Sequence, residues 1–105
     1  MTPNRRARAR TPITRPYVAH LLSTAGTVVT VAVPIDVSRS GFRTDATGEF
    51  RVGERLKLEP QRPHPLGGRC FPFTVVWSKP SPAAEFGGVF AEEITEAERD
   101  ALAAG

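Results

Sequence analysis

Residues 27–33 read Thr-Val-Val-Thr-Val-Ala-Val, and this stretch decides the fold class. All of its residues except Ala32 are β-branched, a side-chain shape that packs well on a pleated sheet and is restricted in helices. The stretch therefore predicts a strand. Pro34 follows directly, and its missing N–H indicates an edge position or a bulge at that point.

Further strands are predicted on both sides of this stretch. Residues 55–59, Arg-Leu-Lys-Leu-Glu, alternate between polar and apolar side chains, as a half-buried strand does. The other predicted strands lie at residues 16–22, 42–44, 69–78 and 86–90. Glycine, proline and small polar residues predict turns or loops at residues 23–26, 36–41, 45–48, 60–68 and 80–84.

The end of the chain changes character and predicts one short helix over residues 95–103. Thr95 and Glu98 have the spacing of a capping box, and acidic residues suit the positive end of a helix. The pattern of about six short strands followed by one helix favours a mainly β protein, either a small antiparallel barrel or a sandwich.

Composition bounds the class of protein. The chain has 105 residues, which suits a single domain, and its nine glycines and ten prolines agree with many turns. The single cysteine, Cys70, excludes an internal disulfide framework and is expected to be a small core residue of its strand. No apolar run reaches the length of a membrane span, and no apolar segment follows the first arginines as in a secretory signal, so we expect a cytoplasmic protein.

Charge is distributed in blocks. Residues 1–16 hold five arginines and no acid, whereas residues 85–105 hold six acids and one base. The first block should attract an anion and the last should repel one. Arginine supplies twelve of the fourteen basic residues, and its planar guanidinium can grip phosphate with two parallel hydrogen bonds and stack on a base.

The sequence does not indicate an enzyme or a metal centre. His20 and His64 are far apart in the chain and no Cys-x-x-Cys pair accompanies them. A Gly-x-Ser-x-Gly elbow and a phosphate-binding loop ending in Gly-Lys-Ser/Thr are also missing. We therefore expect no catalytic residues, no bound metal and no cofactor.

The first motif that stands out is the pair Arg6 and Arg10, spaced as Arg-x-x-x-Arg within the N-terminal block. In an extended arm, guanidinium groups four residues apart reach separate groups of one ligand about 10 Å or more apart. A solvated basic tail is the alternative interpretation.

The second motif is Asp36-x-Ser38-x-x-Gly41, which follows a predicted strand. Aspartate can accept from the N–H groups of a base, and serine can donate or accept. Glycine permits a positive φ and lets a flat ring approach the backbone. Taken alone, this pattern is also that of an ordinary turn between strands.

Together the two motifs resemble the PilZ domain family, which has an Arg-x-x-x-Arg stretch before its first strand and an Asp/Asn-x-Ser-x-x-Gly turn some way on. The likeness extends to Val52-Gly53-Glu54-Arg55-Leu56, to Val75-Val76-Trp77 and to the closing strand and helix, and so covers nearly the whole chain. It implies a six-stranded antiparallel β-barrel with a short C-terminal helix. Residues 1–11 would form a flexible basic arm, and residues 12–105 the barrel and helix.

The resemblance also implies a ligand, the bacterial second messenger cyclic di-GMP. By resemblance, Arg6 and Arg10 grip the ligand from the arm, and the facing shelf is formed by Asp36, Ser38 and Gly41. Arg5, which precedes the motif, would assist. For Trp77 two roles stay open, stacking on a guanine or packing in the core.

On this reading the ligand orders the arm across the barrel, and an unidentified effector protein reads the change. Two alternatives remain. One is an adaptor that keeps the fold and binds proteins without the ligand. The other is a small basic barrel for single-stranded nucleic acid, which the acidic C-terminal block and the ordered pair of motifs disfavour.

Overall fold

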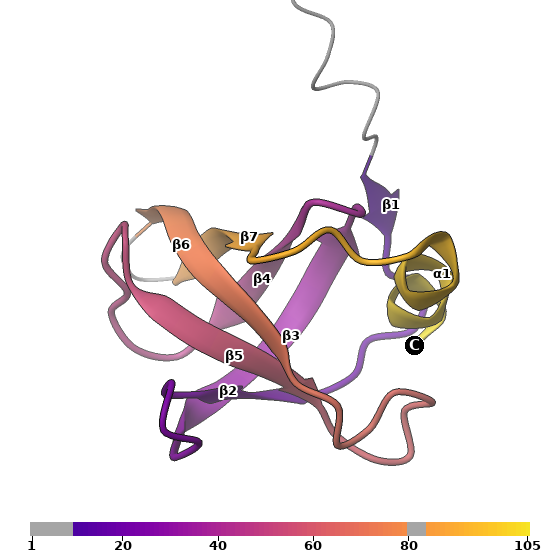
Figure 1. Ribbon diagram of the computed structural model, residues 1–105, viewed down its shortest axis with the longest axis horizontal. Helices are drawn as coiled ribbons and strands as arrows, with labels where there is room; N and C mark the ends of the chain where they lie inside the picture. The colour runs from indigo at the N-terminus through magenta and orange to yellow at the C-terminus, as the bar shows by residue number, and fades with distance from the viewer. Residues whose placement is uncertain (1–9, 80–83) are drawn as a thin grey trace, which may run out of the picture.

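The computed structural model describes residues 10–79 and 84–105. Figure 1 shows a ring of strands with one helix packed at its side. The elements follow the chain in the order β1 (Thr11–Pro12), β2 (Ala19–Leu22), β3 (Val28–Val37), β4 (Gly41–Ala46), β5 (Arg55–Pro60), β6 (Phe71–Lys79), β7 (Glu85–Phe90) and α1 (Glu96–Ala104).

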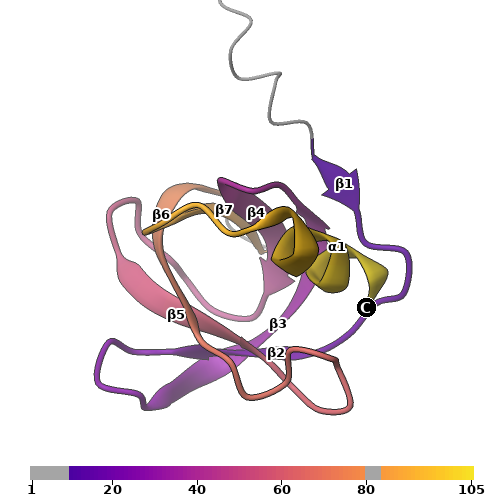
Figure 2. The same cartoon turned by 45° about the vertical axis from the view of Figure 1, so that its right-hand side comes forward.

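Six of the strands close into a barrel. The hydrogen-bonded neighbours run β3-β2-β5-β6-β7-β4, and β4 pairs again with β3, so every strand of the ring has a partner on both sides. All pairings are antiparallel. The short β1 lies outside the ring, as Figure 2 shows, and among the described residues it pairs only with the end of β3. The expectation of a six-stranded antiparallel barrel with a C-terminal helix is confirmed.

The predicted bulge at Pro34 is present, because the register of β3 against β4 shifts between Pro34 and Asp36. Two predicted turns were placed too early. β3 continues through Asp36 and Val37, which pair with β1 on one side and β4 on the other, so the turn occupies residues 38–40. β4 likewise continues to Ala46 because that residue pairs with Ala32 of β3. Pairing between strands thus overrides the local preference of these residues for turns.

The expectation that Cys70 is a core residue is wrong, because its side chain is exposed. β6 begins only at Phe71, and the inward positions of the strand are Phe71, Phe73 and Val75. Cys70 therefore ends the preceding loop.

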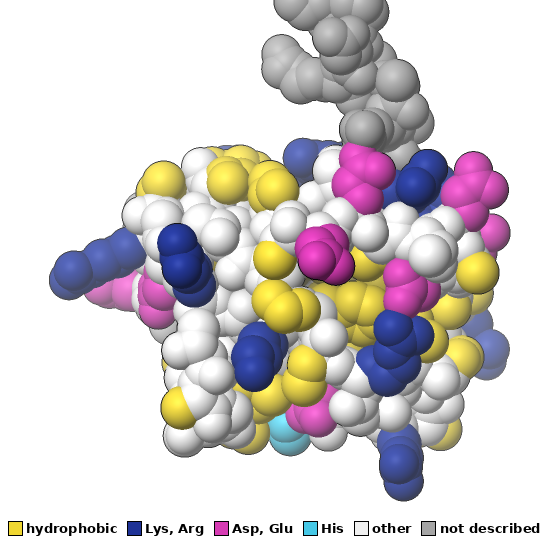
Figure 3. All heavy atoms as spheres, viewed as in Figure 1, with side chains coloured by type: hydrophobic (Ala, Val, Ile, Leu, Met, Phe, Trp, Pro, Cys, Tyr) yellow, Lys and Arg dark blue, Asp and Glu magenta, His cyan; other side chains and the backbone are white. Residues whose placement is uncertain are grey.

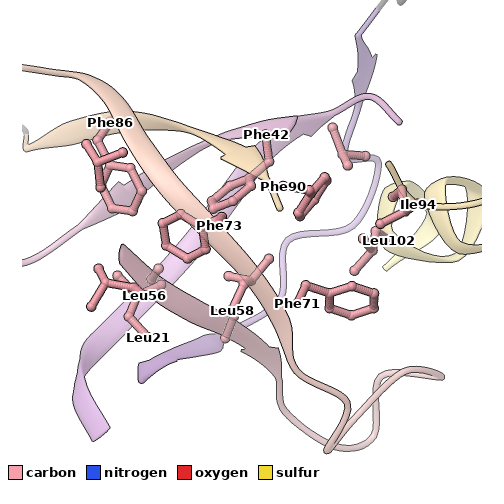
Figure 4. Close-up of a cluster of buried hydrophobic side chains, with 14 of the residues drawn as sticks. Leu21, Phe42, Leu56, Leu58, Phe71, Phe73, Phe86, Phe90, Ile94 and Leu102 are labelled. Carbon is pink, nitrogen blue, oxygen red and sulfur yellow. The ribbon is translucent and has the colours of Figure 1, made fainter. Parts of the chain in front are cut away.

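Aromatic rings fill the middle of the barrel (Figure 4). Phe42 meets Phe73 edge to face with ring centroids 4.8 Å apart, and Phe90 lies 5.4 Å from Phe42. Such tilted arrangements add to the free energy gained from burying the rings. The core continues towards α1 through Ile94 and Leu102, which attach the helix to one end of the barrel.

Two successive glycines of β7 make room for rings on opposite faces. A Cβ at Gly88 would lie 2.7 Å from Phe73 Cδ1 and 2.9 Å from Phe42 Cε1, inside the barrel. A Cβ at Gly87 would lie 2.2 Å from Nε1 of Trp77, on the outside. The missing side chains of Gly87 and Gly88 therefore leave space for aromatic rings of the neighbouring strands on both faces of β7.

The helix begins as predicted. Thr95 is the N-cap, its hydroxyl accepts from the Glu98 N–H, and the Glu98 carboxylate accepts from the Thr95 N–H. The hydrogen bond from the Thr95 N–H, and after it the one from the Arg69 guanidinium, lower the pKa of Glu98. Leu102 and Ala103 are buried against the barrel. Within the described residues, no helix is long and apolar enough to cross a membrane.

Candidate functional site

A row of outward-facing positions crosses four strands of the barrel. Asp36 of β3 pairs with Arg43 of β4, Arg43 pairs with Gly87 of β7, and Gly87 pairs with Trp77 of β6. The row thus places a carboxylate, a guanidinium and an indole side by side on one face. The glycine between Arg43 and Trp77 leaves that face flat.

Two bulges bring Asp36 and Trp77 to this outer face. The register shifts between Pro34 and Asp36 in β3 and between Val75 and Trp77 in β6. In a regular strand, residues two apart share a face, so Trp77 would point inward like the buried Val75. Each bulge inserts one extra residue, so the side chain that follows it points to the other face of the sheet.

Asp36 lies between two cations. Its Oδ2 accepts from Nε of Arg43 at 3.1 Å and lies 3.0 Å from Nη2 of the same guanidinium. Its Oδ1 lies 3.6 Å from Nη1 of Arg10, which is an ion pair but too long for a hydrogen bond. Asp36 is only 8% exposed, and Oδ1 is buried without a hydrogen-bond partner among the described residues. An unsatisfied buried acceptor of this kind is costly, so it requires an explanation.

β1 fixes the position of Arg10. Thr11 pairs with Val37 and Pro12 with Asp36, and the Ile13 N–H donates to the Ile35 carbonyl at 2.9 Å. Arg10 directly precedes this short strand, so it enters beside the Asp36 carboxylate. Its side chain remains 51% exposed and can still meet a ligand.

Ser38 holds the turn together. Its Oγ accepts from the N–H groups of Ser40 and Gly41, each at 3.2 Å, and its own N–H donates to the Gly41 carbonyl at 2.8 Å. The residue is only 4% exposed. The chemistry visible at Ser38 is therefore that of a side chain that fixes the loop beside Asp36.

Gly41 is required for a different reason than the sequence suggested. Its φ is not positive, so that part of the expectation is wrong. A Cβ at Gly41 would lie 2.2 Å from the carbonyl oxygen of Gly88, because β4 and β7 approach closely there. Glycine at this position lets the barrel close next to the turn.

Trp77 is not a core residue. It lies half-buried on the outer face, with its indole over Gly87. Of the two roles left open by the sequence, packing inside the barrel is excluded, and the ring is available on the face that carries Arg43 and Asp36.

The structure thus brings together Arg10, Asp36, Ser38 and Gly41. Trp77 lies in the same row of outward-facing positions but three strands away from Asp36. Arg5 and Arg6 lie outside the described residues. Sequence reasoning missed Arg43, which neutralises Asp36 and also lies 3.9 Å from the Glu85 carboxylate. The predicted turn could have indicated Arg43, because a hairpin around residues 38–40 places the start of β4 opposite the end of β3 and so pairs Arg43 with Asp36.

No group of three or more His, Cys, Asp and Glu side chains that would hold an ion occurs among the described residues. This face presents guanidinium groups, the buried carboxylate of Asp36 and the indole of Trp77.

Comparisons with known proteins agree with this architecture. No match was found among curated proteins. The chain is similar to the structure of the PilZ domain with c-di-GMP of YcgR from Escherichia coli, with 14% identity and a TM-score of 0.68 over 93% of this chain and 86% of that one. It is also similar to YcgR in complex with c-di-GMP from the same organism (15%, TM-score 0.63, 93% of this chain) and to the Bacillus subtilis inhibitor of motility MotI/DgrA (18%, TM-score 0.58, 90% of this chain).

The chain spans less than half of the last two structures, 42% and 46% of their lengths. At these identities the structural likeness shows the fold alone. The model of the PilZ domain family matches residues 4–105, which is almost the entire sequence. The chain therefore belongs to the PilZ domain family.

Proposed function

We propose that this protein is a receptor for cyclic di-GMP, and not an enzyme. The observation that carries the proposal is the cluster of Arg10, Asp36 and Arg43, in which two guanidinium groups flank one buried carboxylate with an unsatisfied oxygen. The cluster needs an additional hydrogen-bond donor at Asp36 Oδ1 and offers cations to an anion. A guanine nucleotide with phosphates supplies both.

Each group of the ligand has a partner of matching chemistry. Phosphate oxygens suit the forked donors of arginine, and Arg10 is exposed enough to turn towards them. The N–H groups on the edge of guanine can donate to Asp36 Oδ1. A purine face can stack on the indole of Trp77, which lies in the same row. Arg5 and Arg6 would add further cations from the preceding segment.

Family membership and the structural neighbours support this assignment. Two of the similar structures are those of complexes with c-di-GMP. We assign the ligand-binding role to Arg6, Arg10, Asp36, Ser38, Gly41 and Trp77, with Arg5 and Arg43 assisting. Ser38 and Gly41 act by shaping the turn that positions Asp36.

The contacts around β1 offer a route by which the ligand reaches the rest of the molecule. The Thr14 N–H, two residues after β1, donates to the Ala103 carbonyl of α1 at 3.0 Å. A ligand that pulls on Arg10 therefore acts on a segment bonded to the helix. We propose that a cytoplasmic effector protein responds to this change, as expected of a ligand-driven switch.

Calorimetric titration with cyclic di-GMP, with GTP as the control nucleotide, tests the function. We expect saturable binding of cyclic di-GMP and much weaker binding of GTP, because GTP carries only one guanine. If neither nucleotide binds, the protein is instead an adaptor that keeps the fold without the ligand. Equal binding of both would contradict a receptor specific for the cyclic dinucleotide.

Trp77 gives the same titration an optical readout, because it is the only tryptophan of the chain. If a guanine stacks on the indole, cyclic di-GMP should quench the tryptophan fluorescence in step with the heat of binding. The variant Trp77→Leu should bind more weakly by roughly fivefold or more, since base–aromatic stacking contributes about 1–3 kcal/mol. Binding without any change in fluorescence would place the ligand away from Trp77.

A further inference from the structure

A crevice lies on the side of the barrel that faces α1, apart from the row that holds Asp36. It has a volume of about 380 Å³, which is within the range of ligand-binding pockets. The buried side chains of Phe71, Phe90 and Ile94 contribute its apolar lining, and the exposed Cys70 and Ala91 lie at its surface.

Acidic side chains surround this apolar lining. Glu92, Glu93 and Glu98 all line the crevice, and Figure 3 shows acidic groups gathered around apolar surface on this face. The one cation in the lining, Arg69, is occupied, since it pairs with Glu98 and lies over the ring of Phe71. Among the described residues, Glu92 has no ion-pair or hydrogen-bond partner and is exposed.

We infer that this crevice is a docking site for a basic segment of a partner protein, with an apolar side chain inserted between Phe71, Phe90 and Ile94. Charge complementarity selects this occupant. Three glutamates and one arginine line the crevice, so it carries a negative charge on a chain whose net charge is +3, and it favours a cationic occupant. An apolar centre within a charged rim is the usual form of a protein interface.

The crevice is joined to the turn between β3 and β4. Arg39 of that turn donates from Nε to the Ile94 carbonyl at 3.0 Å, and the Ile94 N–H donates to the Arg39 carbonyl at 2.9 Å. The guanidinium of Arg39 also lies 3.7 Å from the Glu93 carboxylate. A ligand that shifts the turn would therefore shift one wall of the crevice. This coupling rests on the proposed function, whereas docking itself does not.

The test uses the full chain without nucleotide and a defined probe, a short dye-labelled lysine peptide with two central leucines. Fluorescence anisotropy should show saturable binding, and a peptide with serine in place of leucine should bind much more weakly. Because Cys70 is the only cysteine and lies at the crevice, bound probe should also slow its alkylation by iodoacetamide. Equal binding of the serine peptide, or unprotected Cys70, would overturn the inference.

Matched charge reversals locate the contact. Glu92→Lys replaces an exposed acid at the crevice, and Glu49→Lys replaces an exposed acid that does not line it. We expect Glu92→Lys to weaken probe binding by about three- to tenfold, as for the loss and reversal of an interface charge, and Glu49→Lys to leave it nearly unchanged. Equal effects of the two would show that the peptide responds only to net charge. Because these measurements omit nucleotide, their failure leaves the titration with cyclic di-GMP unaffected.

Discussion

Replacing Arg10 by alanine is expected to weaken cyclic di-GMP binding by roughly ten- to a hundredfold in calorimetry, because one forked arginine contact contributes about 1–3 kcal/mol. The same substitution should leave the circular dichroism spectrum and the melting temperature almost unchanged. Arg10 is half exposed and its ion pair with Asp36 spans 3.6 Å, a geometry that adds little to stability.

Arg15→Ala is the matched control for this variant. It removes the same charge a few residues further along, at an exposed position beyond β1. Its effect on affinity should be small, limited to the change in net charge. Wild-type affinity in Arg10→Ala would refute the role given to this residue, and an equal loss in both variants would reduce that role to diffuse electrostatic attraction.

The second large effect is expected at Gly88. In Gly88→Val, the added side chain would point between Phe42 and Phe73, where even a Cβ has less than 3 Å of space. These rings are enclosed by the core, so the barrel must distort. Overpacking of this kind costs about 3 kcal/mol, which lowers the melting temperature of a domain of this size by roughly 10–20 °C. Thermal unfolding followed by circular dichroism measures the shift.

Gly87→Val provides the comparison, since it adds the same atoms to the adjacent residue of the same strand. There the new side chain meets Trp77 on the outer face, and a half-exposed ring can swing into solvent. We expect a much smaller loss of stability, together with a change in tryptophan fluorescence. If the two variants melted at the same temperature, the assignment of the two faces of β7 would be wrong.

Much of this fold follows from the sequence, because the determining interactions are local. The β-branched run at residues 27–33 and the alternation at residues 55–59 predict strands that the structure contains, and the capping box at Thr95 places the start of the helix. The bulge at Pro34 also follows from local chemistry, since proline cannot donate to the sheet.

The face on which a side chain lies could not be predicted in the same way. Bulges depend on how two strands align, and a shift of one residue moves every following side chain to the other face. Trp77 is outside the barrel and Asp36 lies beside Arg43 for this reason. Similarly, the need for glycine at position 41 arises from the backbone of β7, a strand almost fifty residues further along the chain.

The closed ring of strands limits the ways in which another protein can bind to it. Each of its six strands already has two hydrogen-bonded neighbours, so the ring itself offers no free edge to which a partner could add a strand, a mode that many peptide-binding domains use. The described edge strand is the two-residue β1 outside the ring. The same closure removes the open edges through which sheets aggregate. A partner that binds the ring must therefore be recognised by side chains on the loops, the helix or the outer wall. Evolution or design would change partners by altering those side chains.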